Sequence, residues 1–256
     1  MERKPEWLRV RYNQEAVAEV AQLLGELRLN TVCKEANCPN LGECYRKHTA
    51  TFMILGSQCT RNCRFCNVTP GHPLPPDPDE PENVAAAAKK LGLRHVVLTC
   101  PTRDDLPDGG AEQFAKTVRA IRAACPGVTV ETLISDMKMD TAALDVVIEA
   151  RPEVLNHNVE TVQALQKAVR PQADYQRSLS VLRYCKEKAP SLLTKTGFMV
   201  GLGETEEQIG QLMDDVLAVG CDILTVGQYL QPTPEHYPLA RYATPEDFAR
   251  YKEMAL

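Results

Sequence analysis

The chain has 256 residues, of which 44% are hydrophobic and 25% are charged, and this composition excludes a disordered or collagen-like chain. No apolar run approaches the roughly 20 residues that cross a bilayer, and the start of the sequence, MERKPEWLRVRYNQE, lacks an apolar segment, so we expect neither secretion nor membrane insertion. The net charge of −5 argues against nucleic acid as a partner. We therefore expect a cytoplasmic globular protein with one large domain or two small ones.

Apolar segments alternate along the chain with segments of helical spacing, a pattern typical of βα units around a parallel sheet. Strands are predicted at 51–57, 94–99, 128–134, 154–158, 192–200 and 222–230. Helices are predicted at 83–91, 111–124, 141–150, 161–169, 175–188 and 206–219. Right-handed crossovers would wind these units into an α/β fold, a partial (β/α)6 TIM-like barrel, because eight units are needed to close one.

Two segments fall outside this alternation. Residues 69–82, TPGHPLPPDPDEPE, contain six prolines, which favour an extended connection over a helix interior or a central strand. Residues 1–50 precede the first predicted strand and carry cysteines of their own, with a helix predicted at 14–28. We interpret 1–50 as an N-terminal extension and 51–256 as the barrel.

Ten cysteines in a chain without a secretory signal point to metal binding or thiol chemistry rather than to disulfides. Cys59, Cys63 and Cys66 follow the first predicted strand with the spacing C-x3-C-x2-C, at the end of a strand where parallel α/β folds bind ligands. Three thiolates on a 4Fe–4S cluster leave one iron open to a small molecule. A zinc site is the alternative, although zinc usually takes paired C-x2-C units.

Cys33, Cys38 and Cys44 form a second ordered triplet, C-x4-C-x5-C, and predict a second cluster whose fourth ligand comes from elsewhere in the chain, from solvent or from substrate. Cys100 ends the second predicted strand, on the same rim as the first triplet. The other three cysteines fit small buried hydrophobes: Cys125, Cys185 and Cys221.

The first triplet after the first strand resembles that of the radical S-adenosylmethionine enzymes, and its pairing with the upstream triplet resembles the lipoyl synthase family within them. The similarity runs from about residue 4 to the last residue. It is carried by RKPEWLRV, CPNLGEC, GSQCTRNCRFCNV, RDDLPDGGA, HNVET, VRPQADYQRSL, MVGLGET and GQYLQPTPEHYPLARY.

This resemblance implies an enzyme, a radical S-adenosylmethionine sulfurtransferase that inserts two sulfur atoms, at carbons six and eight, into an octanoyl chain attached to a lysine of a carrier protein. It implies two 4Fe–4S clusters and two S-adenosylmethionine molecules per turnover. Cys59, Cys63 and Cys66 would hold the cluster that binds S-adenosylmethionine, and Cys33, Cys38 and Cys44 the auxiliary cluster that gives up sulfur. An unactivated C–H bond resists acids, bases and nucleophiles, so radical chemistry from a cofactor suits this task.

The resemblance and the strand positions also indicate contacts to S-adenosylmethionine. Phe65 resembles the aromatic residue beside the adenosyl group, with loop packing as the alternative. Glu131, late in the third predicted strand, and Asn158, at the end of the fourth, occupy positions suited to ribose or methionine contacts. Arg170 suits the methionine carboxylate, with a surface salt bridge as the alternative.

Two further pairs of residues carry less specific predictions. Gly201 and Gly203 resemble the segment that approaches the adenine, with turn glycines as the alternative. Asp104 and Asp105 are expected either to cap the helix at Ala111 or to face solvent in the loop.

The resemblance implies protein partners as well. They are an octanoylated lipoyl-carrier domain, as in the glycine cleavage H protein or a 2-oxoacid dehydrogenase E2 subunit, an electron donor such as ferredoxin or flavodoxin, and an iron–sulfur carrier protein. Neither nucleic acid nor a membrane is expected.

One feature of the family is missing from the sequence. The auxiliary cluster's fourth ligand in this family is a serine in an RSSY segment near the carboxyl terminus, whereas this sequence ends YKEMAL and contains no RSSY. We expect either a truncated chain or a different fourth ligand. The alternative functions are another two-cluster sulfur-inserting radical enzyme, biotin-synthase-like or methylthiotransferase-like, and a non-catalytic metal-binding module.

Overall fold

The structure is a computed structural model that describes residues 4–8, 22–31 and 49–256. The described residues fall into two compact units. The N-terminal unit comprises residues 22–31, 49–61 and 67–155, and the C-terminal unit comprises residues 4–8, 62–66 and 156–256. Within these described ranges, no helix is both long and apolar enough to cross a membrane.

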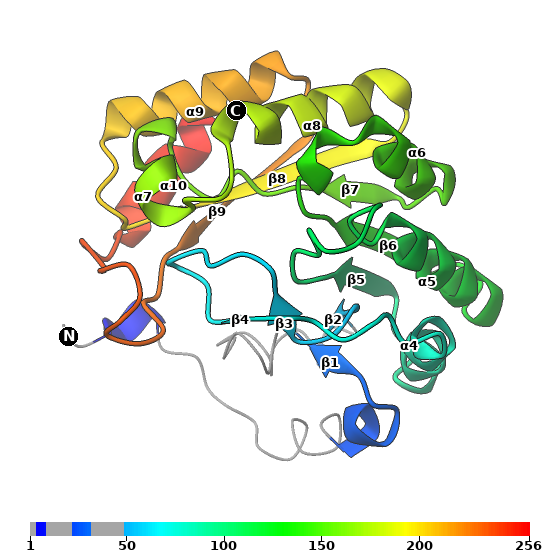
Figure 1. The fold of residues 1–256 in the computed structure, drawn as a ribbon. Coiled ribbons are helices and arrows are strands. Elements are labelled where there is room, and N and C mark those ends of the chain that lie inside the picture. Colours follow the sequence, from blue (N-terminus) through cyan, green and yellow to red (C-terminus); the bar gives the residue numbers. More distant parts are fainter. Residues whose placement is uncertain (1–3, 9–21, 32–48) are drawn as a thin grey trace. The chain divides into compact units, whose positions relative to one another are not determined.

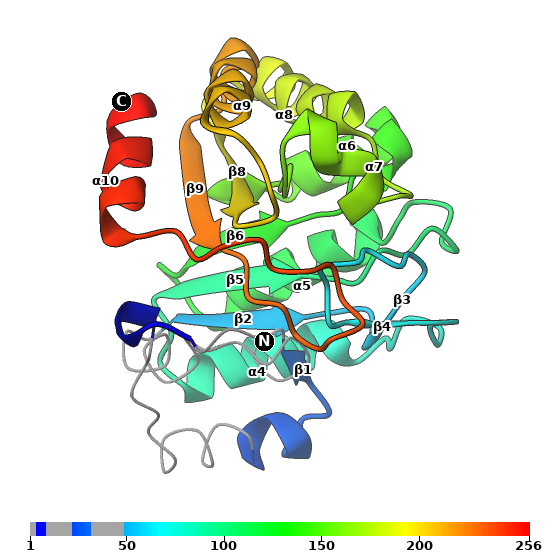
Figure 2. The same ribbon diagram turned by 90° about the vertical axis from the view of Figure 1, so that its left-hand side faces the viewer.

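The N-terminal unit is built on a sheet in the order β1 (Asn30–Thr31), β2 (Thr49–Met53), β5 (His95–Thr99) and β6 (Thr129–Leu133). β2, β5 and β6 are parallel, with Phe52 opposite Leu98 and Leu98 opposite Thr132, whereas β1 is antiparallel to β2. Both views show the three parallel strands side by side (Figures 1 and 2). Their carboxyl ends therefore share one edge of the sheet.

Three helices of this unit follow the strands: α4 (Glu80–Lys90), α5 (Ala111–Ala124) and α6 (Thr141–Glu149). α5 lies between α4 and α6 and packs against both (Figure 1). The buried faces of the helices and strands form the core, with Val84, Phe114, Leu144 and Val96 fully buried. A short 3-10 turn, η2 (Met137–Met139), connects β6 to α6.

The C-terminal unit contains the parallel strands β8 (Leu193–Val200) and β9 (Ile223–Gln228). Its helices are α7 (Gln166–Val169), α8 (Tyr175–Lys188), α9 (Glu206–Ala218) and α10 (Pro245–Met254), with the 3-10 turn η3 (Gln163–Leu165) before α7 and η1 (Glu6–Leu8) near the start. Capping boxes begin α9 at Thr205 and α10 at Thr244. A core of aliphatic and aromatic side chains packs α8, α9 and α10 onto the strands. β7 (Val154–Asn156) lies at the boundary in sequence between the two units.

All six predicted strands and all six predicted helical segments are present, with shifted ends. Segment 161–169 is a 3-10 turn followed by a one-turn helix rather than one helix. α4 begins at Glu80, three residues before its predicted start, because Pro81 occupies a first-turn position where no backbone donor is required. α10 was not predicted, and residues 22–26 are the described helical part of the segment predicted at 14–28.

Candidate active site on the three-cysteine loop

The first cysteine triplet lies on one short loop, residues 59–66, hereafter the three-cysteine loop. Before the loop, β3 (Gln58–Cys59) pairs in parallel with β4 (Thr69–Pro70), and Gly71 N–H donates to the carbonyl oxygen of Cys59 at 2.8 Å. These contacts hold the base of the loop within the N-terminal unit.

Cys59 Sγ accepts two backbone hydrogen bonds, from Arg61 N at 3.4 Å and from Thr102 N at 3.3 Å. Backbone donors directed at a cysteine sulfur tune the reduction potential of an iron–sulfur cluster that it ligates. Thr60 donates from both its N and its Oγ1 to the carbonyl oxygen of Thr102, at 3.0 and 2.9 Å. The first half of the loop is therefore held to the segment that follows β5.

Arg61 is buried and makes two bidentate ion pairs, one with Asp104 and one with Asp136. Burial opposes its charge, but hydrogen bonds to both carboxylates raise the pKa of the Arg61 guanidinium above its usual value. Asp104 and Asp136 follow the carboxyl ends of β5 and β6. The loop is thereby tied to the edge of the sheet where a parallel α/β fold places its site.

The second half of the loop belongs to the C-terminal unit and is held mainly through its backbone. Arg64 N donates to Val169 O at 2.9 Å, and Tyr237 N donates to Arg64 O at 2.7 Å. His236 Nε2 lies 3.0 Å from Cys66 O. Phe65 packs against the cluster of Val169, Leu202 and Tyr229, which agrees with the loop-packing alternative and leaves its predicted contact with the adenosyl group untested.

The three thiols have the chemistry that an iron–sulfur cluster requires. Among the described residues, Cys59, Cys63 and Cys66 form no disulfide and are partly exposed, and soft thiolate ligands select such clusters. Cys59 lies in the N-terminal unit, and Cys63 and Cys66 lie in the C-terminal unit. In the part of the chain that the structure describes, no three His, Cys, Asp or Glu side chains converge closely enough to hold a metal ion as they stand. The fit therefore rests on the donor set and on the way the loop is held. Cys33, Cys38 and Cys44 lie outside the described residues.

Two predicted contacts to S-adenosylmethionine, Asn158 and Arg170, lie together in the C-terminal unit. Arg170 is buried, and its Nη1 donates to the carbonyl oxygens of Asn158 and Val159 at 3.3 and 3.1 Å, while its buried Nε has no hydrogen-bond partner among the described residues. Asn158 Nδ2 donates to Glu160 Oε1 at 3.2 Å. Burial raises the pKa of the Glu160 carboxyl, and Arg170 opposes this shift. A buried guanidinium with a free donor suits a carboxylate ligand better than it suits the surface salt bridge considered as the alternative.

Glu131 is buried on β6 in the N-terminal unit, and its Oε2 lies 3.4 Å from His95 Nε2 on the adjacent strand. The structure thus gives Glu131 a protein neighbour, and its predicted contact with ribose or methionine stays a prediction.

Gly201 and Gly203 both have left-handed backbones, with φ of 100° and 105°. At Gly201 the missing side chain is required by the protein itself, because a Cβ there would lie 2.5 Å from Arg241 O and from Gln228 Nε2. At Gly203 the nearest described atom to such a Cβ would be Ala240 Cβ, at 3.9 Å. Of the two, Gly203 therefore has the more open surroundings.

Neither Asp104 nor Asp105 caps α5, so that expectation was wrong. Asp105 is exposed, as the solvent-facing alternative predicted, whereas Asp104 is only partly exposed. Asp104 pairs with Arg61, and Asp105 pairs with the buried Arg103, whose hydrogen bonds lower the pKa of the Asp105 carboxyl. Asp108 makes the contacts at the start of α5 instead, accepting from the backbone N–H groups of Gly110 and Glu112. Asp104 and Asp105 pair with arginines because buried guanidinium groups require charged partners.

Cys100, singled out for its place at the end of a strand, has surroundings that disfavour its thiolate. Burial raises the pKa of the Cys100 thiol, so it stays protonated at neutral pH. Among the isolated cysteines Cys185 is fully buried, as predicted, while Cys125 and Cys221 are partly exposed.

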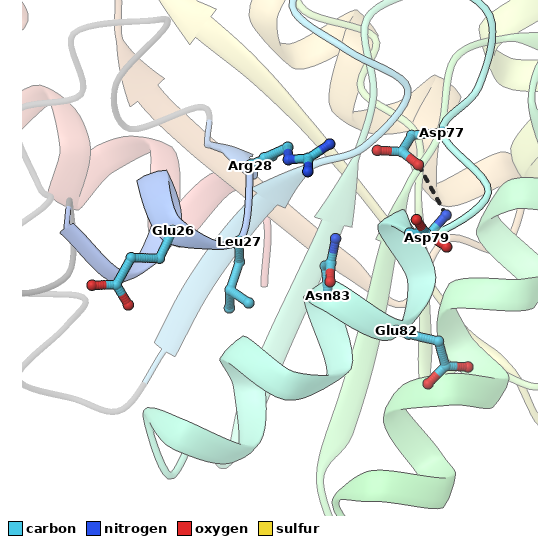
Figure 3. A pocket seen from close by; sticks show the side chains of 7 residues that line it. All are labelled: Glu26, Leu27, Arg28, Asp77, Asp79, Glu82 and Asn83. Carbon is cyan, nitrogen blue, oxygen red and sulfur yellow. Dashed lines mark hydrogen bonds between the residues drawn. The ribbon is translucent and has the colours of Figure 1, made fainter.

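A pocket of about 300 Å³ in the N-terminal unit contains none of the predicted site residues (Figure 3). It lies between residues 26–28 and the start of α4, and its lining is mainly acidic. The lining residues are Glu26, Leu27, Arg28, Asp77, Asp79, Glu82 and Asn83.

Comparison with known proteins decides the family. The model of the Radical SAM superfamily matches residues 53–216. The chain is 56% identical to a lipoyl synthase of Caldanaerobacter subterraneus subsp. tengcongensis, over 98% of this chain and 88% of the relative. It is also 56% identical to a lipoyl synthase of Rubrobacter xylanophilus, over 99% of this chain and 79% of the relative. The chain belongs to the lipoyl synthase family.

This membership makes the chain a radical S-adenosylmethionine enzyme that inserts sulfur, with S-adenosylmethionine and 4Fe–4S clusters as its cofactors. It favours lipoyl synthase over the biotin-synthase-like, methylthiotransferase-like and metal-module alternatives.

Solved structures share the fold at low sequence identity. Methylornithine synthase (PylB) matches with a TM-score of 0.63 and 16% identity, over 96% of this chain and 71% of that one. HydG, a maturase of the [FeFe]-hydrogenase, matches with a TM-score of 0.63 and 13% identity, over 96% of this chain and 61% of that one. The predicted fold class, an α/β fold of the partial TIM-like barrel type, is confirmed.

Proposed function

We propose that Cys59, Cys63 and Cys66 hold the cluster at which S-adenosylmethionine binds, in an enzyme that inserts sulfur at carbons six and eight of a protein-bound octanoyl group. The observation that carries this proposal is the three-cysteine loop, with three partly exposed thiols and backbone donors directed at Cys59 Sγ. The bound cofactors would supply a 5′-deoxyadenosyl radical able to remove hydrogen from an unactivated carbon.

The residues around Arg170 would hold the methionine end of S-adenosylmethionine. The free, buried Nε of Arg170 is a charged donor suited to the methionine carboxylate, and main-chain carbonyls orient its guanidinium. We assign Asn158, Glu131, Phe65 and Gly203 to the remaining contacts, with Gly203 allowing close backbone approach to the adenine. Gly201 would only shape this turn.

Cys33, Cys38 and Cys44 would hold the auxiliary cluster that gives up sulfur. They lie within the proposed N-terminal extension at 1–50, which precedes the proposed barrel at 51–256 in the sequence.

The family's substrate is an octanoylated carrier protein. We propose that the carrier is the glycine cleavage H protein or a 2-oxoacid dehydrogenase E2 subunit, that ferredoxin or flavodoxin supplies electrons, and that an iron–sulfur carrier protein rebuilds the consumed cluster. All of these partners would meet the enzyme in the cytoplasm.

The deciding experiment uses the full chain, purified without oxygen and supplied with iron and sulfide. Incubation with S-adenosylmethionine, a reductant and an octanoyl-lysine peptide should release 5′-deoxyadenosine and yield a lipoyl-lysine peptide. About eight irons per chain are expected, because each cubane holds four. Release of no deoxyadenosine, or iron for one cluster only, would overturn the assignment.

A further inference from the structure

Arg61 is the one residue of the three-cysteine loop whose charged side chain is fully withdrawn from solvent, with 4% of it exposed. Its Nε and Nη2 donate to the two oxygens of Asp104 at 2.7 and 2.9 Å, and its Nη1 and Nη2 donate to the two oxygens of Asp136 at 2.9 and 2.7 Å. We call these three residues the Arg61 clamp. Taking three charges out of water is costly, and two bidentate pairs offset that cost while fixing the planar guanidinium in one orientation.

The clamp joins the loop to two neighbouring strands. Asp104 lies on the segment after β5 and Asp136 on the segment after β6, and these strands are paired in parallel. Arg61 therefore contacts the segments that follow both strands, and it lies two residues after the proposed ligand Cys59 in the sequence. A shift of the guanidinium would move the backbone N–H that Cys59 Sγ accepts.

A second set of contacts depends on the same placement. Asp104 N donates to Thr60 Oγ1 at 3.0 Å, while Thr60 Oγ1 donates to Thr102 O. Thr102 N in turn donates to Cys59 Sγ at 3.3 Å. The two backbone donors to Cys59 Sγ are thus both connected to the ion pair between Arg61 and Asp104. One donor is Arg61 N itself, and the other, Thr102 N, is linked through Thr60 to Asp104.

The turn that presents Asp136 is strained, with left-handed backbones at three successive residues other than glycine: Met137, Lys138 and Met139. Lys138 N donates to Asp136 Oδ1 at 3.0 Å, and Lys138 Nζ donates to Asp104 O at 3.2 Å. Such backbone strain persists only where surrounding contacts fix it, and it gathers at sites that need a group held in place. Here the group held in place is the buried carboxylate of Asp136.

We propose that Arg61 is the positioning residue of the three-cysteine loop, holding Cys59 at the carboxyl ends of β5 and β6 and offsetting the charge of the two carboxylates there. This inference rests on the proposed role of Cys59, Cys63 and Cys66 as cluster ligands. It assigns Arg61, Asp104 and Asp136 no contact with the substrate. They act through Cys59.

The test compares four variants of the full, anaerobically reconstituted chain: Arg61→Met, Arg61→Lys, Asp136→Asn and the control Lys186→Met. Lys186 also makes a two-bond ion pair, with Asp222 at 2.8 and 2.9 Å, but this pair lies at the amino end of β9. The measurements are deoxyadenosine released per bound cluster, the midpoint potential of the cluster at Cys59, Cys63 and Cys66, and its electron paramagnetic resonance signal.

Arg61→Met should lower the rate per bound cluster by roughly 10–100-fold, the usual effect of losing a residue that orients a metal ligand. Arg61→Lys should rescue part of the rate, because a single ammonium keeps the charge and loses the bidentate geometry. Arg61→Met removes one positive charge beside the two carboxylates, of which Asp104 keeps Lys138 Nζ at 3.8 Å, and should lower the potential. Asp136→Asn removes one negative charge and should raise it. Lys186→Met should lower stability and leave the potential and the resonance signal unchanged.

A wild-type rate per cluster with an unchanged potential in Arg61→Met would overturn the inference. If Arg61→Met does not fold, Asp136→Asn decides, since an unchanged or lowered potential in that variant is equally contrary. Failure of the wild-type chain to release deoxyadenosine would instead count against the proposed function, and the potentials would still decide on the clamp.

Discussion

The two halves of the three-cysteine loop are held by different kinds of contact. Residues 59–61 are fixed in the N-terminal unit by side chains, through the buried ion pairs of Arg61 and the hydroxyl of Thr60. Residues 62–66 are fixed in the C-terminal unit largely through their own main-chain atoms, which contact Val169 O, Tyr237 N and the side chains of Gln172 and His236. Side-chain contacts depend on residue identity and backbone contacts do not, so the first half should be the more sensitive to substitution.

The largest expected effect comes from removing one of the three proposed cluster ligands. Cys63→Ala should abolish deoxyadenosine formation, because two cysteines do not hold a cubane cluster. The product is measured by chromatography after incubation with S-adenosylmethionine and a reductant. Cys38→Ala is the matched control, and it should keep deoxyadenosine release measurable while losing sulfur insertion. Equal loss of cleavage in both variants would contradict the division of labour between the two triplets.

The next largest effect tests whether Arg170, in the C-terminal unit, binds the methionine carboxylate of S-adenosylmethionine. Arg170 follows Val169, whose carbonyl oxygen accepts from Arg64 N. Arg170→Lys removes the free Nε donor, and losing one charge-assisted hydrogen bond should raise the KM for S-adenosylmethionine roughly 10–100-fold. Initial rates at varied S-adenosylmethionine concentration measure it. An unchanged KM would indicate that Arg170 has a purely structural role.

How far the sequence predicts this site differs between the halves as well. The spacing of Cys59, Cys63 and Cys66 and their position after a strand are local signals, and they locate the loop. The partners of Arg61 lie 43 and 75 residues away, at Asp104 and Asp136, and no local pattern links such distant positions. The one signal was an arginine between two cysteine ligands, which requires an acidic partner if it is buried.

The fold shows the same division between local and distant information. The six strands were predicted because apolar runs mark them, whereas α10 was missed because its sequence, PEDFARYKEM, has one fully buried residue, Tyr251. A helix with so narrow a buried face carries a weak periodic signal. The start of α4 was misplaced because Pro81 was taken as extended chain rather than as a first-turn residue.

A smaller effect is expected from a substitution in the first half of the loop, residues 59–61. Thr60→Val keeps the shape of the side chain but removes the hydroxyl that donates to Thr102 O and accepts from Asp104 N. The free energy of unfolding should fall by about 1–2 kcal/mol, since two partly buried backbone groups lose a partner. Denaturant unfolding of the apoprotein measures it. Ser180→Ala, which removes an exposed hydroxyl bonded within α8, should change it by less than about 0.5 kcal/mol.

The smallest expected effect comes from the second half. The Arg64 side chain is exposed, lies 5.4 Å from the centre of the Tyr237 ring and donates from Nη1 to Ala168 O at 3.4 Å. The backbone hydrogen bonds of the loop there are made by Arg64 N and O. Arg64→Met keeps both backbone bonds, so the free energy of unfolding should fall by about 0.5–1 kcal/mol, the usual contribution of an exposed cation–π contact. Deoxyadenosine release per bound cluster should stay within about twofold of wild type, because a backbone-held cysteine does not depend on that side chain. A loss as large as that of Arg61→Met would mean that side chains position both halves of the loop, and the contrast between them would be wrong.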